Sequence, residues 1–200
     1  MKNIEMIKEI QQKLGIEVDG LAGPQTWSAI YTHILKKKLP VSPTDQVDER
    51  SERVIATLQP EVQIYARALI HKAEEVGIDI KVISGLRTYA EQDKLYAQGR
   101  TENIKGGIVT NAKGGQSNHN FGIAFDIGVF EGKEYLEDSP KYKAVGALGM
   151  QLGLEWGGNW KTIVDQPHFQ LRPLWAKDLS EKEMLAALRE RKDKDQAIYT

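Results

Sequence analysis

The chain has 200 residues, of which 40% are hydrophobic, and a formal net charge of −1 at pH 7. This length and composition predict one domain with a substantial core plus a small additional module, and the balanced charge argues against a nucleic-acid-binding protein. There is no cysteine, which excludes disulfides and thiolate ligands, so any bound metal must use histidine and carboxylate groups. No apolar run is long enough to span a membrane, and charged residues interrupt the N-terminus, so we expect no secretory signal.

Residues 1–38 are predicted to form a small helical module. Apolar residues recur at helical spacing from Ile4 to Leu14, a turn-rich connector follows over residues 15–23, and Pro24 opens a second helix. The segment LGIEVDGLAGPQTWSAI resembles the peptidoglycan-binding repeat, whose sequences run LG-x-x-VDG-x-x-G-x-x-T. The resemblance implies a module that binds the cell wall. The alternative is a helical hairpin packed as a lid on the main domain.

A linker is predicted over residues 39–50, because this stretch has two prolines, few large apolar residues and dense charge. The lysine run Lys36–Lys38 just before it could touch anionic wall polymers. We favour the simpler interpretation, in which it complements a helix dipole and stays solvated.

Helical and strand patterns alternate through residues 51–200, which we assign to the main domain. Helices are predicted over Glu61–Val76, Thr88–Gln98, Pro140–Leu152 and from Ser180 onward, and strands over Lys81–Ser84, Phe121–Val129 and Pro167–Leu171. This order predicts an α+β fold, with an antiparallel sheet backed by helices. The charged tail, residues 189–196, is expected to fray.

The predicted strand Phe121–Val129 carries one carboxylate, Asp126, on a face that is otherwise nearly bare. Bulky apolar residues alternate there with glycine and alanine, which is the period of a strand with two different faces. A face cleared of side chains has room for a metal and a substrate. His119 lies just before this strand.

A second cluster contains Asp165 and His168, on chain that Pro167 keeps out of a regular helix. Two imidazoles and one carboxylate, from His119, Asp126 and His168, are ligand types that a catalytic zinc takes while keeping a fourth position open. Asp165 is predicted to be the base that accepts a proton from the attacking water. The alternative is that Asp165 only orients His168.

Arg87 lies at a predicted strand-to-helix junction, where a guanidinium could pair with a substrate carboxylate or with a carbonyl oxygen turning anionic. The alternative is a structural salt bridge. A glycine-rich loop ends at Ser117, and we expect it to form a pliable rim along an extended peptide, with Ser117 binding substrate or bracing the metal site. His33 and His71 lie on helix-like segments without ligand partners, so we expect them to be structural.

Three motifs together resemble the zinc D-Ala-D-Ala carboxypeptidase and L-alanyl-D-glutamate endopeptidase family. They are SGLRT at Ser84–Thr88, the S-x-H-x-x-G-x-A-x-D pattern at Ser117–Asp126 and D-x-P-H-F at Asp165–Phe169. The segments YAEQDKLYAQGR and VTNAKGGQS look closest to the endopeptidase branch, found in phage endolysins and some bacterial cell-wall hydrolases. The resemblance spans roughly residues 82–171. It implies Zn2+ bound by His119, Asp126 and His168, Asp165 as general base, and Arg87 on the substrate or the oxyanion.

The sequence therefore predicts a zinc peptidase that cleaves the peptidoglycan stem peptide between L-Ala and D-Glu. One alternative is a D,D-carboxypeptidase, which would share every metal ligand. The other is a non-enzymatic wall-binding protein with a structural zinc, as in the related fold of hedgehog signalling domains. We expect a monomer that acts in the cell wall and, lacking a recognisable signal, is released by a holin or by lysis.

Overall fold

The computed structural model describes residues 3–22, 26–27, 29–30, 33, 46–161 and 163–199. The chain divides into two compact units, Met1–Gln46 and Val47–Thr200, and each is considered by itself. None of the helices in the described ranges is long and apolar enough to cross a membrane.

The N-terminal unit contains helix α1 (Asn3–Leu14) and a buried glutamine that organises the turn after it. The Gln11 side chain accepts a hydrogen bond from the Gly20 amide at 2.8 Å and donates to the Leu21 carbonyl at 3.0 Å and to the Thr26 hydroxyl at 2.9 Å. Residues 26, 27, 29, 30 and 33 are helical. The rest of the predicted second helix, the lysine run and most of the predicted linker lie outside the described residues.

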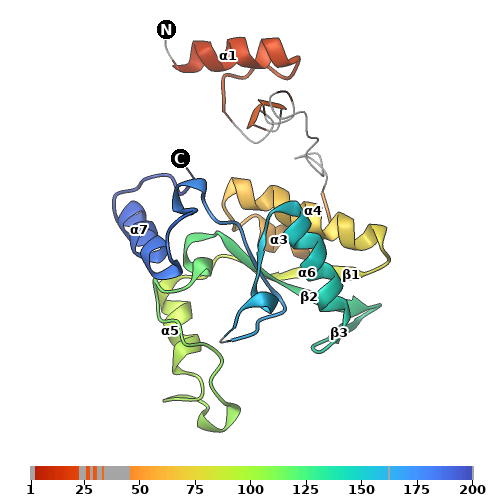
Figure 1. Ribbon diagram of the computed structural model, residues 1–200, viewed down its shortest axis with the longest axis vertical. Coiled ribbons are helices and arrows are strands. Elements are labelled where there is room, and N and C mark those ends of the chain that lie inside the picture. Colours follow the sequence, from red (N-terminus) through yellow and green to blue (C-terminus); the bar gives the residue numbers. More distant parts are fainter. Residues whose placement is uncertain are drawn as a thin grey trace. The chain divides into compact units, whose positions relative to one another are not determined.

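The second unit is α+β, as predicted, with an antiparallel sheet and helices around it (Figure 1). Its described elements are α3 (Glu49–Ile55), α4 (Pro60–Glu75), β1 (Asp79–Ser84), α5 (Tyr89–Ala97), η1 (Ile104–Gly106), η2 (Asn118–Phe121), β2 (Ala124–Glu131), β3 (Glu134–Leu136), α6 (Lys141–Leu152), β4 (Glu155–Trp156), η3 (Gly157–Asn159), β5 (His168–Gln170), η4 (Leu174–Ala176) and α7 (Glu181–Asp193).

The sheet places the predicted metal ligands on adjacent strands. Its order is β1-β2-β5-β4, with β3 pairing the far end of β2, and the paired strands are antiparallel. In the registers, Asp126 on β2 lies opposite His168 on β5 and opposite Ser84 on β1. Directly opposed residues of an antiparallel pair project to the same face. The strand pairing therefore brings the Asp126 and His168 side chains together.

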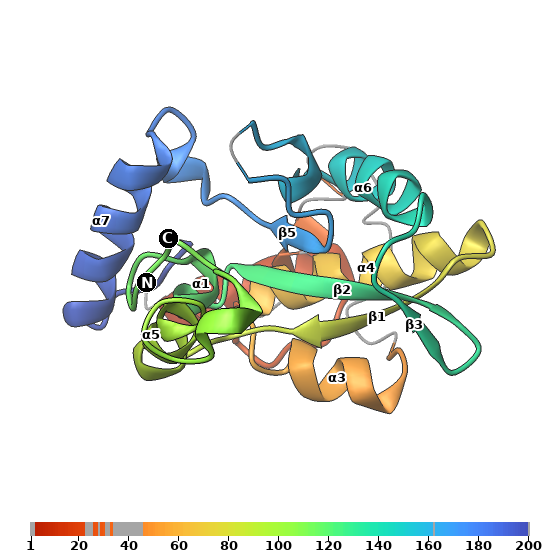
Figure 2. The same ribbon diagram turned by 90° about the horizontal axis from the view of Figure 1, so that it is seen from below.

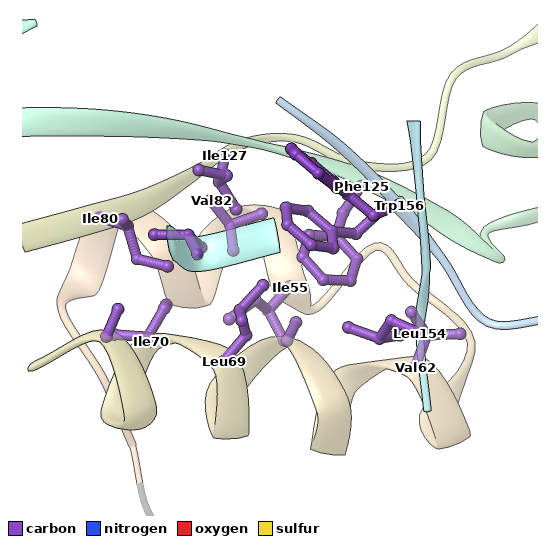
Figure 3. Close-up of a cluster of buried hydrophobic side chains, with 14 of the residues drawn as sticks. Ile55, Val62, Leu69, Ile70, Ile80, Val82, Phe125, Ile127, Leu154 and Trp156 are labelled. Carbon is purple, nitrogen blue, oxygen red and sulfur yellow. The ribbon is translucent and has the colours of Figure 1, made fainter. Parts of the chain in front are cut away.

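Helix α4 covers one face of the sheet and forms the main core with it. Figure 3 shows Val62, Leu69 and Ile70 of α4 facing apolar side chains of β1 and β2. These α4 residues are at most 2% exposed, and burying such a side chain contributes about 1.5–3 kcal/mol each. This core fixes the positions of strands β1 and β2, which carry residues of the site.

A second apolar cluster lies at the end of the sheet remote from β3, where α7 packs (Figures 1 and 2). Phe121 and Ile123 from the start of the β2 segment are buried there against Met184 and Leu188 of α7. This cluster anchors the segment that carries His119.

Two sequence-based expectations are wrong at this end of the molecule. The strand predicted from Phe121 begins only at Ala124, because η2 occupies Asn118–Phe121 and Gly122 ends that turn in the left-handed region with φ of 68°. The alternation of Phe121 and Ile123 with small residues resembles a strand, but these two side chains are buried against α7. The tail expected to fray continues α7 to Asp193, and Ile198 beyond it is buried.

Helix α3 and the short strands β3 and β4 were not predicted. Helix α3 begins at Glu49, inside the predicted linker, with Asp48 as its N-cap accepting a hydrogen bond from the Ser51 amide at 3.1 Å. Strands β3 and β4 span three and two residues, too few for their patterns to show a period.

We expect Gly146→Ala to lower the free energy of unfolding by about 1–3 kcal/mol. Helix propensity alone would favour alanine by about 1 kcal/mol, but a Cβ at this position of α6 would overlap the Trp156 indole. Chemical denaturation of the single and double variants measures the effect. The penalty should vanish in a Trp156→Leu background, and a penalty that persists there would show that the indole is not its cause.

Candidate active site

The structure brings the three predicted metal ligands together from η2, β2 and β5. The Asp126 Oδ1 atom lies 3.2 Å from His119 Nε2 and 3.2 Å from His168 Nδ1, and these two nitrogens are 3.2 Å apart. His119 and His168 are 3% and 5% exposed. The three side chains form a group that could hold a metal ion, with ligand atoms within 4.8 Å of one another.

The outer nitrogen of each imidazole faces an oxygen that can only accept a hydrogen bond. His119 Nδ1 donates to the Gly85 carbonyl at 2.8 Å, and His168 Nε2 donates to Gln170 Oε1 at 3.0 Å. These partners place the ring protons on the outside and leave two lone pairs facing each other beside the Asp126 carboxylate. When both inner nitrogens are unprotonated, the cluster is repulsive unless a cation lies among the donors, so the donor set fits a divalent metal.

Asp126 is suited to be the anionic ligand of this group. Burial alone would raise the pKa of its carboxyl group. In the metal-free site, the charge of the two imidazoles and their hydrogen bonds to the carboxylate, present when their inner nitrogens carry protons, outweigh burial and hold the pKa well below its usual range. The group is therefore ionised throughout the physiological pH range, as metal binding requires.

Asp165 lies beside the three ligands without belonging to the group they form. Its carbonyl accepts a hydrogen bond from the His168 amide at 3.3 Å, and its own amide donates to the Gly157 carbonyl at 3.1 Å. Burial raises the pKa of its carboxyl group, and the negative charge of Asp126 raises it further. A carboxylate with a raised pKa next to a metal-binding group has the properties of a general base.

Arg87 follows β1 and contacts the second oxygen of Asp126. Its Nη2 atom lies 3.5 Å from Asp126 Oδ2 and donates to the Ser84 hydroxyl at 3.1 Å, and Nη1 donates to Gln92 Oε1 at 2.8 Å. Its amide donates to the His119 carbonyl at 3.0 Å. The guanidinium is thus fixed beside the ligand group, and its side chain remains 20% exposed.

Comparisons with known proteins identify the family. A family model described as D-alanyl-D-alanine carboxypeptidase matches residues 110–171, a span that includes both histidines and both aspartates of the site. The chain is 38% identical over 132 residues to the peptidoglycan L-alanyl-D-glutamate endopeptidase CwlK of Bacillus subtilis (strain 168), which covers 60% of this chain and 77% of that protein. The chain belongs to the family of this L-alanyl-D-glutamate endopeptidase.

Two further proteins are similar to part of the chain. The L-alanyl-D-glutamate peptidase of Listeria phage A118 is 29% identical over 124 residues, covering 60% of this chain and 40% of the phage protein. The crystal structure of the Serratia marcescens L-Ala D-Glu endopeptidase ChiX superposes with a TM-score of 0.47 at 25% identity, covering 63% of this chain and 89% of that one.

In this family member a buried asparagine holds the loop before His119. Asn120 is fully buried, and its Oδ1 accepts hydrogen bonds from the amides of Gly115 at 2.9 Å and Ser117 at 3.3 Å. Its Nδ2 donates to the Arg87 carbonyl at 2.8 Å. Ser117 is half-buried, and this bond through its main chain ties it to the site.

Helix α7 supports the same loop from the other side. Arg189 donates to the Gly115 carbonyl at 2.8 Å, and Lys192 donates to the Asn120 carbonyl at 3.2 Å. Near the start of α7, Glu181 accepts a hydrogen bond from the Asn118 amide side chain at 2.5 Å. Sequence reasoning missed these contacts, because charged residues on a polar helix carry no periodic signal for the partner they reach.

Sequence reasoning also missed Trp160. Its ring lies 4.8 Å from the His168 ring, centroid to centroid, and the residue is 38% exposed. The sequence signal that could have identified it is a large aromatic residue in the glycine-rich stretch 157–160. Away from the site, His71 on α4 has its Nδ1 atom 3.3 Å from Glu74 Oε2, and His33 is exposed. Neither belongs to the group formed by the three ligands.

Proposed function

We propose that this protein is a zinc-dependent peptidoglycan hydrolase that cuts the stem peptide between L-Ala and D-Glu. The observation that carries the proposal is the convergence of three possible ligand atoms near Asp165, which lies outside their group. The chain is also related to proteins named as L-alanyl-D-glutamate peptidases. A catalytic zinc site takes three protein ligands, whereas structural sites take four. The acid next to the three ligands also favours an enzyme over a structural zinc protein.

The proposed reaction assigns a role to each side chain around the scissile bond. His119, Asp126 and His168 hold the metal, which when bound supplies a Lewis acid and lowers the pKa of water. Asp165 accepts a proton as water attacks the carbonyl carbon and delivers that proton to the leaving amine as the C–N bond breaks. Arg87 pairs with the carbonyl oxygen as it becomes anionic, or with a substrate carboxylate. Ser117, at the rim, is proposed to contact the peptide.

We expect Arg87→Lys to lower kcat by about 10²–10³-fold, the usual cost of losing one donor to a developing oxyanion. Lysine keeps the charge but lacks the planar guanidinium group, whose two Nη atoms bond Gln92 and Ser84 simultaneously. Steady-state kinetics together with a zinc dissociation constant check this. A large loss of zinc affinity with kcat preserved at saturating zinc would instead identify Arg87 as a support for Asp126.

Digestion of purified peptidoglycan tests the proposed bond. Cleavage between L-Ala and D-Glu frees a new amino group on D-Glu, which amino-terminal labelling and mass spectrometry detect. A D,D-carboxypeptidase would instead release free D-Ala without new D-Glu termini. Tight binding to intact sacculi with neither product would contradict enzymatic function and favour a wall-binding protein.

We also propose that residues 1–38 bind the cell wall and thereby raise the effective concentration of the peptidase on its polymeric substrate. Leu21 and Trp27 are 66% and 56% exposed, so their apolar side chains can contact a ligand. In the full-length protein, replacing both with serine should lower activity on sacculi and leave activity on a soluble stem peptide unchanged. Equal losses on both substrates would contradict a wall-binding role. Sedimentation of the intact protein tests the expected monomer.

A further inference from the structure

A buried glutamine connects the ligand His168 to a carboxylate on the neighbouring strand. Gln170 is 1% exposed and lies two residues after His168 on β5, opposite Glu155 of β4. Its Oε1 atom accepts a hydrogen bond from His168 Nε2 at 3.0 Å, and its Nε2 atom donates to Glu155 Oε2 at 2.6 Å. The amide is therefore bonded on both sides.

The direction of these bonds follows from the chemistry of Glu155. An ionised carboxylate only accepts hydrogen bonds, so the amide group of Gln170 must present its NH2 to Glu155. The carbonyl oxygen of the same amide must then point toward His168. Because that oxygen can only accept, the ring proton of His168 is placed on Nε2, and the lone pair on Nδ1 faces Asp126 and His119.

Three further groups hold this arrangement in one orientation. Arg172 donates to Glu155 Oε1 at 2.5 Å and to Glu181 Oε2 at 2.8 Å. Asn118, next to His119, donates through Nδ2 to Gln170 Oε1 at 2.6 Å. A second donor on the Gln170 carbonyl opposes rotation of the amide, and the Arg172 guanidinium holds the Glu155 carboxylate in place.

We propose that Gln170 is a positioning residue and that Glu155 sets the orientation of its side-chain amide. Together the two residues orient Nδ1 of His168 toward the metal. The inference deepens the proposed function, because it concerns the metal site on which that function rests. Histidine ligands generally donate their second N–H to a fixed partner, and removal of such a partner costs about 10–100-fold in metal affinity. Here the partner is a neutral amide whose orientation depends on a second, charged residue.

Zinc affinity and the His168 tautomer test the proposal without using activity. Gln170→Leu and Glu155→Gln should each raise the zinc dissociation constant by about 10–100-fold, as measured by competition with a chromophoric chelator. The ¹⁵N chemical shifts of the His168 ring in the zinc-bound protein should show Nδ1 as the ligand in the parent chain. In the zinc-bound variants, the Nε2 resonance should shift from its position in the parent chain, because its hydrogen-bond acceptor is lost or free to rotate.

A matched control and a polarity swap separate this role from a structural one. Glu52→Gln removes the charge from another Arg–Glu pair, with Arg67 at 2.7 Å, and should leave zinc affinity and the His168 shifts unchanged. The double variant Glu155→Gln/Gln170→Glu reverses which residue carries the charge but keeps an acceptor facing His168. It should recover most of the affinity that Glu155→Gln loses.

Parent-like zinc affinity and ring shifts in both Gln170→Leu and Glu155→Gln would overturn the proposal. So would a swap variant no better than Glu155→Gln, provided that thermal unfolding shows it to be folded. These outcomes are distinct from failure of the proposed function. A parent chain that binds zinc yet frees no D-Glu termini would refute the hydrolase, while the zinc and ring-shift measurements would still decide the role of Gln170.

Discussion

Asp165→Asn is expected to lower kcat/KM on peptidoglycan by about 10²–10⁴-fold, the usual contribution of a positioned general base, while zinc remains bound. Asparagine preserves the volume of the side chain and cannot accept the proton of the attacking water. Because Asp165 lies outside the ligand group, the zinc dissociation constant should change little. Its pKa, raised by burial and by Asp126, gives the native carboxylate a stronger affinity for that proton than an exposed aspartate has.

The matched control for this prediction is Asp138→Asn, the same substitution at an exposed aspartate, which should have parent activity. Kinetics on a soluble stem peptide and metal analysis of the purified variants provide the two readouts. If Asp165→Asn kept full activity with zinc bound, the base assignment would be wrong. If it lost zinc and activity together, Asp165 would act as a support for His168.

Replacing His119 or His168 with alanine is expected to remove zinc binding and to lower activity by at least about 10³-fold. A metal Lewis acid contributes several kcal/mol to transition-state stabilisation, and each 1.36 kcal/mol corresponds to a factor of ten in rate. Chelation of the parent protein should have the same effect, and added zinc should reverse it. Zinc binding and activity should both depend on the cluster of His119, Asp126 and His168, whose facing atoms lie 3.2 Å apart.

His71→Ala is the control for the histidine variants, because His71 lies on α4 and bonds Glu74. It should bind zinc and cleave the substrate as the parent does. Full activity of the parent in the presence of excess chelator, confirmed by metal analysis to be zinc-free, would refute the metal-dependent mechanism.

The convergence of the ligands could be predicted because their chemistry is visible in short segments. Asp126 stands among small residues, and His168 follows a proline that keeps this segment out of a regular helix. His119 and His168 are 49 positions apart and Asp126 and His168 are 42 apart, so only the strand pairing brings them together. Periodicity predicted both strands, and antiparallel pairing then limits which residues can meet.

The supports of the site could not be predicted in the same way. Gln170 sits on β5 as a polar residue between apolar ones, and nothing in a two-residue period distinguishes a buried amide from an exposed one. The start of β2 was misplaced because Phe121 and Ile123 alternate as strand residues do, although they pack against α7. A local pattern predicts that an apolar side chain is buried, but it does not predict which part of the fold that side chain packs against.

The contacts of α7 bear on where the peptidase unit ends. The family match ends at residue 171, but Glu181, Arg189 and Lys192 bond Asn118, Gly115 and Asn120 on either side of His119. A fragment cut after Leu171 would keep every proposed ligand and lose the helix that braces one of them. We therefore expect the folded peptidase unit to extend through α7. A truncation designed from the family boundary alone should retain the proposed metal ligands and bind metal poorly.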